Sequence, residues 1–332
     1  MLCGLALLAA GLAVTTSLER KRLAATLPAA AAPEARLDGA AILDDLRSLA
    51  SPAMQGRRTG TPGGLRARAF LAGRFRQAGL LPFGAGYLMR FSFVHRSLRA
   101  LWRRDRPFRM SFPDAANVLG YVRGREQPDS YLVLSAHYDH LGIRGGAVYP
   151  GADDNASGVA ALLGEARFLA AHPPRHSVIL AAFDAEELGL RGARAFLERP
   201  PVPLERLAFE LNLDMLSRSA DRSIVVAGTG PRPRLAPLVA WAAARSAVRV
   251  RLGHDRPASR GGLVQDWSTA SDHGPFRDRG IPWLYLGVED HEDYHRPGDS
   301  VDKIDTSFFL RVAELVRNLV EGLDQAPRTL LP

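Results

Sequence analysis

The stretch "SVILAAF", residues 177–183, is an uninterrupted apolar run and is followed at once by the acidic sequence "DAEE", residues 184–187. A strand that is apolar at every position is typical of a sheet buried on both faces, whereas a half-exposed strand alternates apolar and polar residues. A parallel sheet with helices on both sides provides such burial. The stretch therefore predicts a central strand of an α/β fold, with acidic side chains at its carboxyl end.

Strand-like and helix-like segments alternate along the rest of the chain. In residues 155–171, Val159, Leu162, Leu163 and Ala166 recur at the spacing of one helix face. The same criteria predict further strands at 116–123, 131–136, 207–213, 223–227 and 281–288, and further helices at 38–50, 65–79, 191–199, 233–247 and from Thr306 onward. This alternation indicates a largely parallel sheet with helices on both faces.

Length and composition fit one large globular domain. The chain has 332 residues, of which 46% are hydrophobic and 23% charged, enough to bury a sizeable core, and it shows no internal repeat or second domain of comparable size. Cys3 is the only cysteine, which excludes an intrachain disulfide and a cysteine metal cage. Any metal site must therefore use His, Asp and Glu.

The net charge of +8 comes mainly from arginines spread along the chain. Basic and aromatic residues interleave most densely in 90–109, a pattern found at membrane surfaces and in nucleic-acid-binding proteins. We favour a solvated, arginine-rich surface over a strand and loop for this segment, and we predict no nucleic-acid partner.

The N-terminal 35 residues differ in composition from the rest of the chain. Residues 1–18 are almost entirely apolar and precede "ERKR", whereas a signal peptide carries its positive charge before the apolar stretch. This order indicates either a start codon upstream of Met1 or a short membrane anchor, and residues 24–35 resemble a low-complexity linker. We predict a signal or anchor segment with its linker at 1–35 and one folded domain at 36–328. The protein would be exported, periplasmic or extracellular, or anchored in the membrane.

Acidic residues and histidines follow four of the predicted strands and also fill the turn into the helix at 155–171. The motifs are "HYDH" (137–140), "GADDNASG" (151–158), "DAEE" (184–187), "DM" (214–215) and "EDYHRPGD" (292–299). Because the carboxyl ends of parallel strands meet at one edge of a sheet, we expect these side chains to lie together. Carboxylates a few ångströms apart cannot all stay ionised without cations, so the sequence predicts a pair of divalent metal ions.

The spacing within these motifs suits a metal site. His137 and Asp139 are two residues apart on a strand and project to the same side, as a ligand histidine and the carboxylate that orients it would. Glu186 and Glu187 are consecutive, so their side chains diverge. One can bind metal while the other acts as a general base beside it.

The motifs occur together in a recognisable order. "HYDHLG", "GADDNASGVAA", "DAEELGLRGARAF", "LNLDM", "SDHGPF" and "YHRPGDSVDKID" resemble the M28 family of di-zinc aminopeptidases, with matching order and spacing from about residue 40 to residue 325. The resemblance implies a three-layer α/β/α sandwich around a mixed, mainly parallel sheet of about eight strands.

The resemblance also implies a role for each motif residue. His137 and Asp214 would hold one zinc ion, Glu187 and His295 the other, and Asp154 would bridge both, while Glu186 would be the general base and Asp139 the partner of His137. For the neighbouring Asp153, the sequence leaves three roles open: capping the helix, shaping the turn or tuning the site. The implied activity is removal of N-terminal residues from peptides that have a free N-terminus, by a water molecule activated between two zinc ions. Cobalt or manganese could replace zinc in such a site.

Two other functions are compatible with the same scaffold. Glutaminyl cyclases resemble it but form pyroglutamate by intramolecular transfer, usually with one zinc, and some receptor ectodomains have lost the ligands. Here no ligand position is missing, which favours the peptidase. Of the remaining histidines, His273 and the neighbouring Asp272 are expected to line or brace the pocket, and the sequence favours no direct role for His140 or His291.

Overall fold

The computed structural model describes residues 36–97, 108–255 and 266–326 of the chain. The predicted signal or anchor segment at 1–35 and part of the basic segment 90–109 lie outside these ranges. Within them, no helix is both long and apolar enough to cross a membrane.

The centre of the molecule is a single mixed sheet. Among the described residues it contains eight strands: β1 (Leu88–Ser97), β2 (Phe108–Val122), β3 (Gln127–His137), β6 (His176–Phe183), β7 (Leu207–Leu213), β8 (Ser223–Ala227), β9 (Arg249–Leu252) and β10 (Trp283–Gly287). Their order across the sheet is β1-β2-β6-β3-β7-β10-β8-β9. The neighbouring pairs β6/β3, β3/β7, β7/β10 and β8/β9 are parallel, and the pairs β1/β2, β2/β6 and β10/β8 are antiparallel. A short hairpin, β4 (Gly142–Arg144) and β5 (Ala147–Tyr149), stands apart from this sheet.

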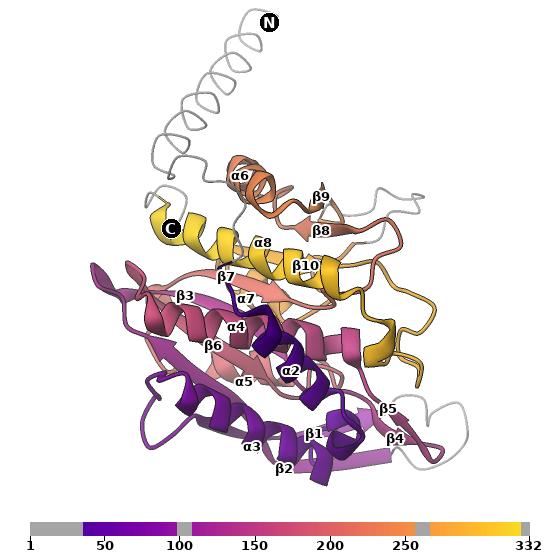
Figure 1. The fold of residues 1–332 in the computed structure, drawn as a ribbon. Coiled ribbons are helices and arrows are strands. Elements are labelled where there is room, and N and C mark those ends of the chain that lie inside the picture. The colour runs from indigo at the N-terminus through magenta and orange to yellow at the C-terminus, as the bar shows by residue number, and fades with distance from the viewer. Residues whose placement is uncertain (1–35, 98–107, 256–265, 327–332) are drawn as a thin grey trace, which may run out of the picture.

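Helices cover both faces of the sheet (Figure 1). They are α2 (Gly39–Leu49), α3 (Pro62–Gln77), α4 (Gly158–Ala171), α5 (Arg191–Glu198), α6 (Ala236–Ser246), α7 (His273–Asp278) and α8 (Thr306–Gln325). In the view of Figure 1, α2, α4 and α8 cross in front of the sheet, and α5 and α7 lie behind it. The predicted α/β/α sandwich with a mixed sheet of about eight strands is confirmed.

The central strands are apolar at every position because they pack against a helical layer on each side. In β3, Leu132 and Leu134 join the core cluster that contains α2, α4 and α8. The alternate residues Tyr131 and Val133 join a second cluster on the opposite face, together with Phe196 of α5. Burial of each such Leu or Phe side chain contributes about 1.5–3 kcal/mol to stability.

Most predicted elements agree with the structure to within a few residues, and the differences have physical reasons. The helix predicted at 155–171 begins at Gly158, because residues 152–157 form an irregular turn in which Asp154 and Asn155 leave helical geometry. Strand β1 occupies the first part of the segment 90–109; it is an edge strand paired only with β2, so its outer positions tolerate arginine.

Candidate functional site

The predicted site residues meet at the carboxyl ends of the parallel strands. His137 is the last residue of β3, Glu186 and Glu187 lie just after β6, and Asp214 directly follows β7. The loop that carries His295 follows β10. These side chains line a cleft of about 320 Å³, whose walls include Leu190, Met215, Trp267, Tyr285 and Tyr294.

One cluster of metal-ligand type contains His137, Asp154 and Asp214. The Nε2 atom of His137 lies 3.2 Å from Oδ1 of Asp214 and 3.4 Å from Oδ1 of Asp154. All three residues are at most 8% exposed. A histidine nitrogen and two carboxylate oxygens therefore converge on one small, buried volume.

A second cluster uses the other oxygen of Asp154. Its Oδ2 atom lies 3.0 Å from Nε2 of His295, which is also 3.4 Å from Oε2 of Glu187. His140, for which no direct role is predicted from the sequence, joins this cluster: its Nδ1 lies 2.8 Å from Oε1 of Glu187. Asp154 thus has one oxygen in each cluster.

The neighbouring Asp153 faces away from both clusters. Its Oδ1 accepts hydrogen bonds from the Ser217 amide at 2.7 Å and hydroxyl at 2.6 Å, and the Ser157 hydroxyl is 3.3 Å away. Asp153 therefore ties the turn 152–157 to the segment after β7, as expected for a residue that shapes the turn.

Two side chains with no predicted role hold the turn that carries Asp154. The Asp299 carboxylate accepts hydrogen bonds from the amides of Asp153 and Asp154, each at 3.0 Å. The Asn155 side chain donates to the Leu213 carbonyl at 2.8 Å. The turn is thereby fixed both to the end of β7 and to the C-terminal motif.

Arg57, in the loop motif "GRRTGTPGG", is a fully buried cation behind the site. Its guanidinium donates to the carbonyls of Leu49, Tyr138, Pro150 and Gly151 at 2.6–2.9 Å. Burial lowers its pKa to about 10, against the opposing effect of Asp154 and Asp299, so the group stays charged at neutral pH. Arg57 clamps together the two segments that flank His137 and Asp154.

Asp139 supports both His137 and the backbone of Glu186. The Nδ1 atom of His137 lies 3.1 Å from the Asp139 carbonyl oxygen and 3.8 Å from its carboxylate, so the closer contact is with the backbone rather than the predicted carboxylate. The carboxylate accepts a 2.9 Å hydrogen bond from the Glu186 amide. The Thr59 hydroxyl donates to Asp184 at 2.8 Å, and its oxygen lies 3.3 Å from the Asp139 carboxylate.

The cleft concentrates negative charge. Its described lining residues include Asp154, Glu186, Glu187, Asp214 and Asp290 but no lysine or arginine. Burial first, and then the neighbouring carboxylates, raise the pKa of Glu186 well above its usual value, although His137 opposes the shift. Bound divalent cations would reverse this balance and favour the ionised carboxylates.

Three of the non-glycine residues with a positive φ lie beside the clusters. Ala185, Met215 and His295 have φ values of 59°, 63° and 55°, in the left-handed region that non-glycine residues rarely adopt. Each is either a cluster residue or directly adjacent to Glu186 or Asp214. Such strain persists where the surrounding structure holds a functional geometry.

The predicted supporting role of the "SDHGPF" motif agrees with the geometry. His273 is buried and its Nε2 lies 2.7 Å from the carbonyl oxygen of Trp267, a wall of the cleft. Burial lowers the pKa of His273 to about 3, so it is neutral and donates this bond. His291 lies one step outside the clusters, with Nε2 3.3 Å from Oδ2 of Asp153.

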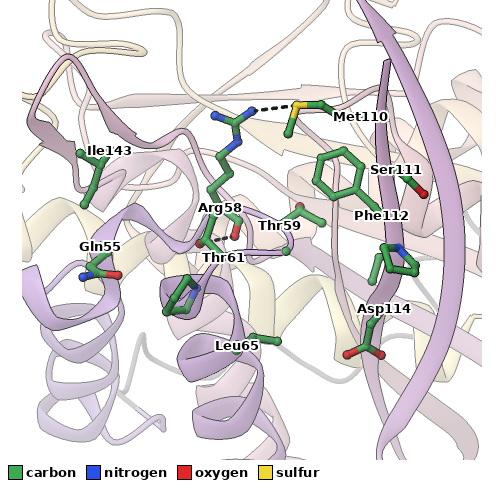
Figure 2. Close-up of a pocket in the computed structure, with 14 residues that line it drawn as sticks. Gln55, Arg58, Thr59, Thr61, Leu65, Met110, Ser111, Phe112, Asp114 and Ile143 are labelled. Atoms are coloured by element: carbon green, nitrogen blue, oxygen red, sulfur yellow. Dashed lines mark hydrogen bonds between the residues drawn. The ribbon is translucent and has the colours of Figure 1, made fainter. Parts of the chain in front are cut away.

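A larger cavity, of about 570 Å³, lies between the loop at 55–62 and strand β2 (Figure 2). Arg58 reaches toward Met110 across it, and Phe112, Leu65 and Ile143 supply apolar walls. None of its described lining residues also lines the cleft, and among them only Asp114 is acidic. The smaller cleft, where the metal-ligand side chains converge, is therefore the candidate site.

Comparison with solved structures shows a shared fold. A zinc aminopeptidase from Bacillus subtilis matches 86% of this chain and 95% of its own, with a TM-score of 0.67 at 18% identity. A glutaminyl cyclase from Bacteroides thetaiotaomicron, bound to N-acetylhistamine, matches 86% and 98%, with a TM-score of 0.64 at 17% identity. At these identities the likeness concerns the fold alone.

Sequence comparison is more specific. Aminopeptidase YwaD of Bacillus subtilis is 30% identical over 211 residues, which cover 60% of this chain and 43% of that protein. The chain spans about half the length of the first curated relatives it matches. The model of peptidase family M28 matches residues 117–320, a range that holds every cluster residue from His137 to His295. The clusters and the strands that carry them therefore lie within a recognised family domain, and the chain belongs to peptidase family M28.

Proposed function

We propose that the protein is a zinc-dependent aminopeptidase that removes N-terminal residues from peptides. The observation that carries the proposal is the division of Asp154, with Oδ1 in the cluster of His137 and Oδ2 in the cluster of Glu187 and His295. A carboxylate placed in this way is suited to bridge two metal ions. Relatives named as a zinc metalloprotease and an aminopeptidase support the choice of metal and reaction.

The donor set fits zinc. Histidine nitrogens and carboxylate oxygens bind zinc at about 2.0–2.2 Å, so two donors on one ion lie roughly 2.8–3.6 Å apart for bond angles between about 90° and 120°. The separations within the clusters, 3.0–3.4 Å around His137 and His295, fall in this range. His137, Asp154 and Asp214 would hold one ion, and Asp154, Glu187 and His295 the other. Cobalt and manganese accept similar donors.

Two zinc ions, when bound, would supply an acidified water molecule and polarise the scissile carbonyl. The chain itself supplies the proton carrier: the Glu186 carboxylate, which belongs to neither cluster, takes a proton from the attacking water and delivers it to the leaving amine. Asp139 fixes the Glu186 backbone through the bond to its amide. Leu190, Trp267 and Tyr285 enclose the reacting groups.

The dimensions of the cleft favour attack at a chain end. Its volume of about 320 Å³ is at the lower limit for ligand sites, which span about 300–1,000 Å³. Such a cleft accommodates a terminal residue better than the middle of a long peptide. We also propose that residues 1–35 direct the protein to export or to the membrane, on the strength of the apolar run at 1–18.

A substrate panel combined with metal analysis tests the proposal. The purified, zinc-loaded protein is expected to cleave free aminoacyl-nitroanilides and short peptides, and to leave the same peptides intact when their N-terminus is acetylated. Cleavage of the acetylated peptides would contradict the aminopeptidase assignment. Ammonia release from N-terminal glutamine peptides without nitroanilide cleavage would instead identify a glutaminyl cyclase. A protein that retains no zinc under metal-replete conditions would support a non-catalytic ectodomain.

A further inference from the structure

His140 is the least expected member of the candidate site. It is the last residue of "HYDH", is 1% exposed, and lies beside the cluster of Asp154, Glu187 and His295. Its Nδ1 is 2.8 Å from Oε1 of Glu187 and 3.6 Å from Oδ2 of Asp154. Its ring and that of His295 approach edge to face, with centroids 5.8 Å apart.

The short contact between His140 and Glu187 is not a well-formed hydrogen bond. Among the described residues, neither ring nitrogen of His140 nor Oε1 of Glu187 has a hydrogen-bond partner with acceptable geometry. A buried imidazole left in this state is costly, because its polar atoms have lost water without compensation. The lone pairs of His140 Nδ1 and Glu187 Oε1 are close together but do not share a proton. They are instead suited to bind one metal ion together.

The distances agree with a shared cation. Donors on one zinc ion are roughly 2.8–3.6 Å apart for bond angles between about 90° and 120°. The two separations measured from His140 Nδ1, 2.8 Å and 3.6 Å, lie at the limits of this range. The two measured from His295, 3.0 Å and 3.4 Å, lie within it.

The backbone makes room for this imidazole. Gly151 has a φ of +58°, and a Cβ atom there would lie 2.6 Å from the Cγ and Cδ2 atoms of the His140 ring. Any other residue would push the ring away from Glu187. The glycine that opens the motif "GADDNASG" therefore allows the ring to reach the cluster.

We infer that His140 is a fourth protein ligand of the zinc ion held by Asp154, Glu187 and His295. This inference rests on the proposed di-zinc function and makes the two sites unequal. The site at His140 and His295 would offer two imidazoles and two carboxylates, enough for a tetrahedral zinc ion, whereas the site at His137 would offer three protein ligands and leave one position open. The four-ligand site should bind zinc first, and the open site should be the one that meets substrate.

The test compares wild type with His140→Ala, His140→Asn and a control, His172→Ala, an exposed histidine at the end of α4. Zinc affinity is measured by competition with a chelator, and ligand number by cadmium NMR of the cadmium-loaded proteins. Loss of His140 should lower the affinity for one of the two zinc ions by at least about 100-fold. Even the loss of a residue that only supports a metal ligand lowers metal affinity by about 10–100-fold. Loss of His140 should also displace one of two cadmium resonances, and the control should change neither.

The outcomes separate this inference from the proposed function. If wild type binds two zinc ions and both His140 variants do so with unchanged affinity and cadmium spectra, His140 is not a ligand. Weaker zinc binding with unmoved cadmium resonances would make it a positioning residue and also overturn the inference. If wild type binds no zinc, the proposed function fails first. Thermal melting of the metal-free proteins identifies a variant that has merely lost its fold, and the milder His140→Asn then carries the comparison.

Discussion

Asp153 and Asp154 are adjacent in the chain, yet their carboxylates have different surroundings. Oδ1 of Asp153 accepts hydrogen bonds from the backbone amide and the hydroxyl of Ser217, whereas Asp154 faces His137, His140 and His295. Burial raises the pKa of Asp154, but the three histidines outweigh burial and bring it well below its usual value. A carboxylate that stays ionised when buried is the kind of group that holds cations.

Glu186→Gln tests the role of the general base. The substitution keeps the size of the side chain and removes its ability to accept a proton, so turnover should fall by about 10²–10⁴-fold. Zinc content should be unchanged, because Glu186 belongs to neither cluster. Kinetics on an aminoacyl-nitroanilide and metal analysis of the same sample provide the measurement. Near-normal turnover in this variant would show that another group carries the proton.

Candidate ligand residues could be predicted from the sequence to lie at one edge of the sheet, because histidines and acids follow apolar strands. His137, Glu187 and Asp214 are of this kind. Arg57 could not be predicted, since its partners are backbone carbonyls as far as 94 residues away, which leave no mark in the sequence. The place of His140 in the site is not predictable for a related reason: its contact with Glu187 depends on the fold.

The turn 152–157 is the element on which the site depends. It departs from helical geometry at Asp154 and Asn155, contains a cis peptide bond between them, and is anchored at both ends by side chains from distant segments. A regular helix starting at 155 would leave Asp154 as an N-cap, with its carboxylate turned to its own backbone amides. The irregular turn frees that carboxylate for the cleft.

Asp299→Ala should loosen this turn. The amides of Asp153 and Asp154 would lose their buried acceptor, which should lower the free energy of unfolding by about 2–4 kcal/mol. Zinc affinity should fall with it, because Asp154 would no longer be held in place. Denaturant unfolding and chelator competition measure the two effects. The exposed Asp302→Ala is the matched control, and equal behaviour of the two variants would refute the anchoring role.

Central elements were more predictable than peripheral ones. Strands at 207–213 and 223–227 match the observed β7 and β8, because strands buried on both faces must be apolar throughout. Strands β1 and β9 lie at the sheet edges and carry arginines at exposed positions, so hydrophobic pattern does not reveal them. The hairpin β4/β5 lies outside the main sheet and its strands are only three residues long, so hydrophobic pattern does not reveal it either.

The whole domain contributes to the site, since the clusters join the ends of β3, β6 and β7 to the turn 152–157 and to the loop that carries His295. Zinc binding should therefore stabilise the entire fold. A ligand present at 1,000 times its dissociation constant stabilises the native state by about 4 kcal/mol. Removing zinc with a chelator should lower the melting temperature by several degrees, and adding zinc back should restore it. A melting temperature that does not change when the chelator is added would contradict metal binding by the native state.

A buried pair far from the cleft, Glu165 and Arg317, predicts a pH effect on stability. Burial raises the pKa of Glu165 from 4.5 to about 7, against the opposing effect of Arg317. The native state therefore holds this proton more tightly than the unfolded state. The resulting stabilisation is complete below about pH 4.5 and is lost as the pH rises through about 7.

Glu165→Gln isolates this effect. Between pH 5 and pH 8, the free energy of unfolding of wild type should fall relative to that of the variant by up to about 3 kcal/mol, since each pKa unit corresponds to about 1.4 kcal/mol. Urea unfolding at several pH values measures this difference in the free energy of unfolding, with the exposed Glu126→Gln as control. Parallel curves for wild type and Glu165→Gln would disprove the shift.

The spread of the cluster residues along the chain also bears on biosynthesis. The first triad is complete once Asp214 has been made, but the second waits for His295, and the clamp on the turn waits for Asp299. An unfinished chain therefore has no paired site, however well its early strands have formed. The C-terminal motif thus completes the arrangement, and both clusters can form only when nearly all of the domain has been synthesised.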